Sequence, residues 1–131
     1  MASIYREFEI NASAEAVWDV IRDVGAIHER FAKGFVVNTV LEGAMRTVTF
    51  ANGFVVREEI VAIDHQHRRL AYRAVGGRAT HHNASFQVFE ISPTRSSIRW
   101  ITDLLPDEVQ SLIEPMVDQG VVAIRATLEQ S

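Results

Sequence analysis

The sequence contains no cysteine among its 131 residues. This absence excludes a disulfide framework, a thiolate metal site and a catalytic thiol. No stretch approaches the roughly 18 consecutive apolar residues that a transmembrane helix requires, and the first ten residues lack the apolar run of a signal peptide. We therefore expect a cytoplasmic protein that does not insert into a membrane.

Positive charge is also scarce. The chain has 13 Lys and Arg residues against 17 Asp and Glu, which gives a formal net charge of −4 at pH 7. No stripe of basic residues marks a surface for nucleic acid, and no polybasic cluster marks an anionic membrane surface. The composition therefore favours a protein whose partner is neither nucleic acid nor a membrane.

The histidines and glycines do not form a metal or phosphate motif. His65 and His67 lie in a polar turn, while the adjacent His81 and His82 point to opposite faces of a predicted strand. Four ligands therefore do not converge, and we expect no metal site. The paired glycines at 76–77 are typical of a hairpin turn rather than a phosphate-binding loop. We expect no cofactor.

Apolar patterning predicts a single domain over residues 1–131. Runs of apolar residues, often in alternation, predict seven strands, near 4–10, 35–41, 45–50, 54–63, 69–75, 82–91 and 96–104. Short turn sequences separate the last six, which is typical of hairpins, so we expect an antiparallel sheet.

Two regions have a helical pattern instead. Residues 13–25 begin with Ser13 as an N-cap and end at Gly25, and 26–34 leave room for one more short helical turn. From 106 to about 129, apolar residues follow the helical period. A sheet curved around this last helix would bury its apolar stripe. We therefore predict an α+β fold.

The turn at 51–53 decides where two charged residues point. A two-residue loop would scatter three charges over the apolar face of the hairpin. A three-residue loop, with Gly53 in the left-handed conformation, keeps that face apolar and places Arg46 directly across from Glu58 on it. Two interpretations stay open: the pair is a structural bridge between strands, or it is a polar anchor in the wall of an internal cavity.

The same alternation assigns inner faces to the later strands and the last helix. Tyr72, His82, Trp100 and Thr102 point inward among apolar side chains. A mostly apolar concavity with a few convergent polar groups is typical of a small-molecule site. The predicted ligand-binding residues are Arg46, Val48, Glu58, Ile60, Tyr72, His82, Phe86, Trp100, Thr102, Ile113, Met116 and Val117.

These residues leave catalysis open. Glu58 beside Arg46 is expected to be ionised, and an inward His82 has the chemistry of an acid or base near neutral pH. No Ser/His/Asp arrangement is identifiable, so we assign no catalytic residue.

Several segments, taken in order, resemble one family. "INASAEAVWDVIRDVGAI", "GAMRTVTFANGFVVREEIVAID", "LAYRA", "SIRW" and "GVVAIRATLEQ" resemble the polyketide cyclase/dehydrase-like branch of the START/Bet v 1-like (SRPBCC) superfamily. The resemblance implies a helix-grip fold, with seven strands around a long C-terminal helix and two short helices after the first strand. It also implies a deep apolar cavity that opens near the short helices.

For function, the resemblance supports binding of a small hydrophobic or aromatic molecule, such as a lipid, a polyketide or another metabolite. We expect a monomer or homodimer. A polyketide cyclase/dehydratase-like enzyme is the alternative, and a regulatory protein with a vestigial cavity is a third. "HERFAKG" replaces the aromatic-His-Pro sequence of many relatives, and His82 stands where an aromatic residue is common. Because both departures lie where a ligand would be selected, no relative's substrate transfers to this chain.

Overall fold

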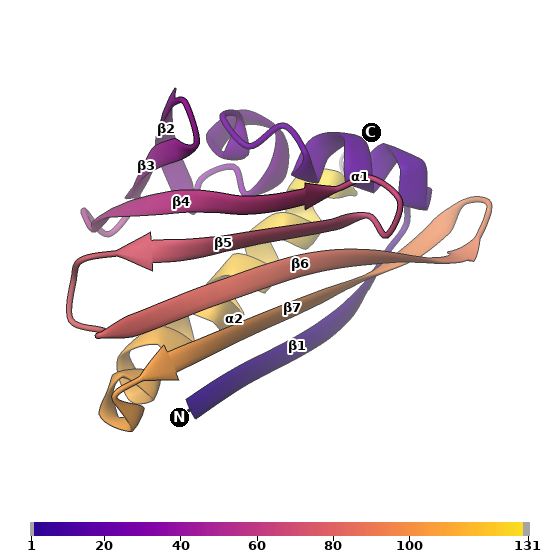
Figure 1. Ribbon diagram of the computed structural model, residues 1–131. Helices are drawn as coiled ribbons and strands as arrows, with labels where there is room; N and C mark the ends of the chain where they lie inside the picture. The colour runs from indigo at the N-terminus through magenta and orange to yellow at the C-terminus, as the bar shows by residue number, and fades with distance from the viewer. Residues whose placement is uncertain (1, 130–131) are drawn as a thin grey trace.

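A seven-stranded antiparallel sheet and a long helix make up most of the computed structural model, which describes residues 2–129 (Figure 1). The spatial order of the strands is β1-β7-β6-β5-β4-β3-β2. This is the predicted α+β helix-grip fold. The strands are β1 (Ala2–Ile10), β2 (Val36–Glu42), β3 (Met45–Phe50), β4 (Val55–Asp64), β5 (Arg69–Val75), β6 (His81–Ser92) and β7 (Arg95–Leu105).

The helical segments lie where the pattern predicts them, with different ends. They are α1 (Ala14–Ile21), the π-helical segment η1 (Ile27–Phe31), the 3-10 segment η2 (Asp107–Val109) and α2 (Gln110–Leu128). The Ser13 hydroxyl accepts a hydrogen bond from the Ala16 N–H at 3.1 Å, as an N-cap does. Helix α1 ends before the predicted Gly25, because the Asp23 N–H bonds to the Val20 carbonyl three residues back and closes the last turn.

The β3–β4 hairpin has the predicted three-residue loop. The Phe50 N–H donates to the Phe54 carbonyl at 2.8 Å, and Gly53 has a φ of +92°. Such a φ is favourable for glycine and strained for other residues. The resulting register pairs Arg46 with Glu58 and places both side chains on the concave face of the sheet.

Helix α2 crosses the concave face of the sheet (Figure 1), and its principal backbone contacts are with β1 and η1. On the β1 side, Arg6 holds the helix by two ion pairs. Its Nε lies 2.7 Å from Asp118 Oδ1, and its Nη2 lies 3.0 Å from Glu114 Oε2. The helix is thus supported at one sheet edge and at η1, while the middle strands lie farther from its backbone.

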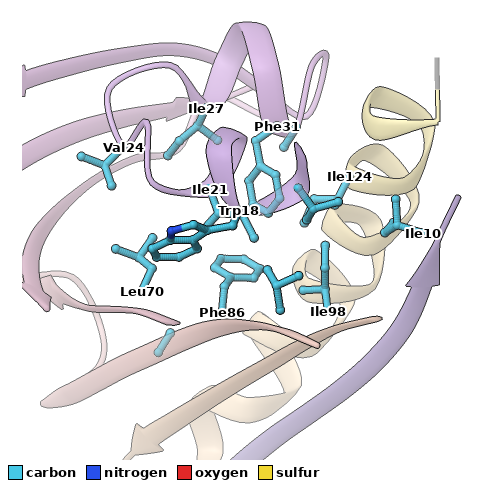
Figure 2. Close-up of a cluster of buried hydrophobic side chains, with 14 of the residues drawn as sticks. Ile10, Trp18, Ile21, Val24, Ile27, Phe31, Leu70, Phe86, Ile98 and Ile124 are labelled. Atoms are coloured by element: carbon cyan, nitrogen blue, oxygen red, sulfur yellow. The ribbon is translucent and has the colours of Figure 1, made fainter. Parts of the chain in front are cut away.

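The two short helical segments cover one end of the concave face. Figure 2 shows Ile21 from α1 and Phe31 from η1 directed toward Phe86 of β6. The Phe31 and Phe86 rings meet edge to face, with centroids 5.1 Å apart, a favourable aromatic geometry. A second, smaller core cluster contains Leu104 and Val117.

Candidate ligand-binding cavity

A cavity of about 110 Å³ lies between the concave face of the sheet and α2. Its wall is mostly apolar, with side chains from α1, η1, α2 and strands β2 to β7. An apolar cavity of about 150 Å³ in another protein accommodates benzene. The space beneath α2 is therefore close to that of a single aromatic ring.

Arg46 and Glu58 form a buried ion pair in this wall. The Arg46 Nε donates to Glu58 Oε1 at 2.8 Å, and the side chains belong to residues only 3% and 8% exposed. A second guanidinium nitrogen, Nη1, donates to the carbonyl of Val24, in the segment between α1 and η1, at 3.2 Å. The guanidinium also lies over the Tyr72 ring, 4.9 Å from its centroid. The pair therefore links β3 and β4 to the segment that covers one end of the cavity.

Burial governs the protonation of the two acidic groups here. It raises the pKa of the Glu58 carboxyl above its ordinary value, and the Arg46 charge opposes that rise. Burial, helped by the Glu58 charge, also raises the pKa of the Tyr72 phenol. Tyr72 is thus a neutral hydrogen-bonding group at physiological pH.

Aromatic rings form another part of the wall. The Phe86 and Trp100 rings stack with centroids 4.6 Å apart. The Tyr72 ring also stacks with Phe86, and their centroids are 6.0 Å apart. The Trp100 Nε1–H donates to the Tyr72 hydroxyl at 3.3 Å. These contacts hold three rings in one array across β5, β6 and β7, a rigid apolar surface for a planar ligand.

His82 and Thr102 supply polar groups on the β6 and β7 side. Burial, followed by the charge of neighbouring His81, lowers the pKa of the His82 imidazole. The neutral imidazole is therefore favoured inside the cavity. Thr102 is 2% exposed and also lines the cavity.

The family model described as polyketide cyclase / dehydrase and lipid transport matches residues 1–129. The chain belongs to this family. Among curated proteins, no relative matches it.

Solved structures with the same fold have low sequence identity to this family member. The protein XoxI from Bacillus cereus is 19% identical, with a TM-score of 0.87 over 99% of this chain and 97% of that one. A START superfamily protein from Mycobacterium smegmatis is 13% identical, with a TM-score of 0.82 over 98% and 97%. Norcoclaurine synthase from Thalictrum flavum, in complex with dopamine and hydroxybenzaldehyde, is 21% identical, with a TM-score of 0.74 over 99% and 88%. At these identities the likeness concerns the fold, which is the START/Bet v 1-like fold that the sequence predicts.

Eleven of the twelve residues predicted from the sequence line the cavity of this family member. Ile60 is the exception: it is half-buried and packs against the main hydrophobic core instead. The pairing of β4 with β5 shifts immediately after Ile60. Such a bulge bends the strand and changes the direction of its side chains.

The twelve predicted residues do not include the part of the wall that comes from the short helical segments. Val20, Ile21, Ile27 and Phe31 all line the cavity. Their apolar character was visible, but periodicity within a short helix does not reveal which part of a sheet it covers. Phe50 and Val56 were also missed, although their alternation with Val48 and Glu58 on the same face indicated them.

Within residues 2–129, no helix is long and apolar enough to cross a membrane. In the same range, no group of three or more His, Asp or Glu residues is arranged to hold a metal ion.

Proposed function

We propose that this protein binds a small hydrophobic or aromatic molecule in the cavity between the sheet and α2. The observation that carries the proposal is an apolar space of about 110 Å³ whose wall contains a buried ion pair. Burying an ion pair costs desolvation free energy and does not by itself favour a stable core. Its retention beside a cavity is understandable if it orients a polar group of a ligand.

In this proposal, residues 1–131 form a single ligand-binding domain, and the protein acts in the cytoplasm as a monomer or homodimer. Its ligand would belong to the classes that the family description names, a polyketide-like molecule or a lipid, or be another small metabolite. The volume favours a small ring or a short apolar segment, because a longer ligand would displace side chains such as Met116.

A matched pair of tryptophan substitutions on α2 tests this proposal. Met116 lines the cavity, whereas Val122, on the same helix, is 70% exposed. Met116→Trp should fill the cavity and abolish the binding of an apolar probe such as p-xylene, measured by titration calorimetry, while Val122→Trp should leave it unchanged. Native mass spectrometry of the purified chain would identify any co-purified molecule. Failure of the wild-type chain to bind p-xylene or any other small aromatic probe, with no co-purified molecule, would refute the proposal.

A second candidate is a cyclase- or dehydratase-like enzyme that acts on such a molecule. The observation in its favour is that two titratable groups face one cavity with pKa values displaced in opposite directions, Glu58 upward and His82 downward. Displaced pKa values of groups that face a cavity are typical of functional sites. An enzyme would lose turnover in His82→Ala while keeping ligand affinity within a few fold, whereas a binding protein would show no turnover with any bound ligand.

A further inference from the structure

Three polar side chains of the cavity wall lie in one transverse row of the sheet. Arg46 of β3 pairs with Glu58 of β4, and Glu58 pairs with Ala74 of β5. The pairing of β5 with β6 ends at Arg73 and Asn83, and Ala74 and His82 are the next residues of the two strands. The row therefore has an ion pair at one side, an imidazole at the other, and a single methyl group between them.

The spacing of this row corresponds to the width of one ring. Neighbouring strands lie about 4.8 Å apart, so Glu58 on β4 and His82 on β6 have backbones about 10 Å apart. That separation accommodates one aromatic ring and a hydrogen bond of about 2.8 Å on each side. The cavity volume of about 110 Å³ leads to the same size independently.

The β6 and β7 side of the row has polar groups without protein partners. Within residues 2–129, neither the Thr102 hydroxyl nor the His82 ring makes a hydrogen bond with another residue. Thr102 pairs with Ala84, two residues along β6 from His82, so the two polar groups are diagonal neighbours. Thr102 is 2% exposed and lines the cavity, so its hydroxyl is available to a ligand there rather than to bulk solvent.

The opposite side of the row holds its polar group in a fixed position. Glu58 Oε1 accepts from Arg46, while no described residue donates to Oε2. The bond from Arg46 to the Val24 carbonyl fixes the guanidinium from behind. A ligand hydroxyl could donate to the carboxylate here without breaking the ion pair.

We propose that the cavity selects single-ring aromatic molecules with polar groups at opposite ends of the ring, one bonded to Glu58 and the other to His82 and Thr102. This inference rests on the proposed function, since it names the ligand class of the same cavity. An apolar group placed against Thr102 and His82 leaves their polar atoms unpaired when water is displaced. Losing these hydrogen bonds to water without replacing them lowers the affinity for the ligand by about tenfold or more.

Isomers of benzenediol test the inference on the full chain. Hydroquinone, resorcinol and catechol have their two hydroxyl groups para, meta and ortho, with closely similar hydrophobicity. Titration calorimetry should give hydroquinone an affinity about tenfold above that of catechol, with resorcinol between them, because the two hydroxyl groups lie farthest apart in the para isomer. This comparison needs no variant, so it does not depend on the folding of one.

A matched pair of isosteric variants gives the second readout. Thr102→Val removes the buried hydroxyl, and Thr47→Val removes a hydroxyl from the outer face of β3. Thr102→Val should lower the affinity for hydroquinone about tenfold and leave that for p-xylene undiminished, while Thr47→Val should change neither.

Equal affinities for the three isomers, or an unchanged hydroquinone affinity in Thr102→Val, would overturn the inference. In that case p-xylene binding to the wild-type chain would still support the proposed function. If neither p-xylene nor any benzenediol binds, the inference and the proposed function both fail, so the two failures are distinguishable.

Discussion

Gly120 is the position on α2 where adding a single methyl group should disturb the packing of the helix against the sheet most directly. A Cβ atom at this position would lie 2.9 Å from Trp100 Cη2, 3.0 Å from Trp100 Cζ3 and 3.3 Å from Phe35 Cε2. Favourable contacts between carbon atoms lie at about 3.5–4.0 Å. The helix backbone and the indole ring thus touch, and Gly120→Ala requires one of them to move by roughly 0.5–1 Å.

Two effects of opposite sign determine how much Gly120→Ala changes the free energy of unfolding. Alanine is favoured over glycine inside a helix by about 1 kcal/mol. Overpacking costs about 1–3 kcal/mol. Although Trp100 lines the cavity, it cannot move freely because it stacks on Phe86 and donates to Tyr72. We expect Gly120→Ala to lower the free energy of unfolding by about 1 kcal/mol, the difference between these terms.

Urea denaturation with a constant m-value measures this difference. Ala126→Gly, at an exposed site in the last turn of the same helix, measures the helix-propensity term without a change in packing and should cost up to about 1 kcal/mol. The indole N–H resonance of Trp100 should shift in Gly120→Ala and not in Ala126→Gly; a Trp18→Phe background separates the two tryptophans. If Gly120→Ala stabilised the chain by the full propensity term with an unshifted Trp100 resonance, the close contact between α2 and Trp100 would be refuted.

Two further predictions concern the titratable groups of the cavity. Arg46→Met alone or Glu58→Leu alone leaves one buried group without its partner and should lower the free energy of unfolding by about 3–5 kcal/mol. The double variant should lie within about 1 kcal/mol of wild type. Equal losses in the single and double variants, measured by urea denaturation, would contradict the buried pair. Because the pKa of His82 is lowered from 6.5 by burial, the unfolded chain binds more protons just below that pH, so this residue's contribution to stability is lost as the pH falls. The unfolding free energy of wild type minus that of His82→Leu should therefore rise with pH up to about 6.5 and stay constant above it, and a difference that is flat between about pH 5 and 7 would contradict the assignment.

Alternation of side chains along strands carried most of what the sequence predicted. The position of Arg46 followed from comparing two loop lengths, because a shift of one residue moves a whole strand face from core to solvent. The same rule placed His82 and Thr102 on the concave side and His81 outside, as the structure has them. A period of two is strict in a paired strand, so one secure turn is enough to orient a hairpin.

The rule fails where pairing is irregular or where helices meet the sheet. Ile60 lies beside a register shift that no local residue pattern announced. The end of α1 at Ile21 depends on a tight turn at Asp23, not on the glycine that ordinarily ends a helix. The contact of Phe31 with Phe86 joins residues far apart in the chain, and nothing in either segment specifies the other.

The volume of the cavity and its polarity are controlled by different parts of the fold. Helix α2 is held by Arg6 at β1 and touches Trp100 through Gly120, so its height above the sheet is set at those points and determines how large a ligand fits. The polar groups belong to strands whose spacing is fixed by backbone hydrogen bonds, so Glu58 and Thr102 keep their separation when the helix moves. It follows that substitutions on α2 should change the size of ligand accepted without changing its pattern of polar groups, while substitutions at Glu58 or Thr102 should do the reverse.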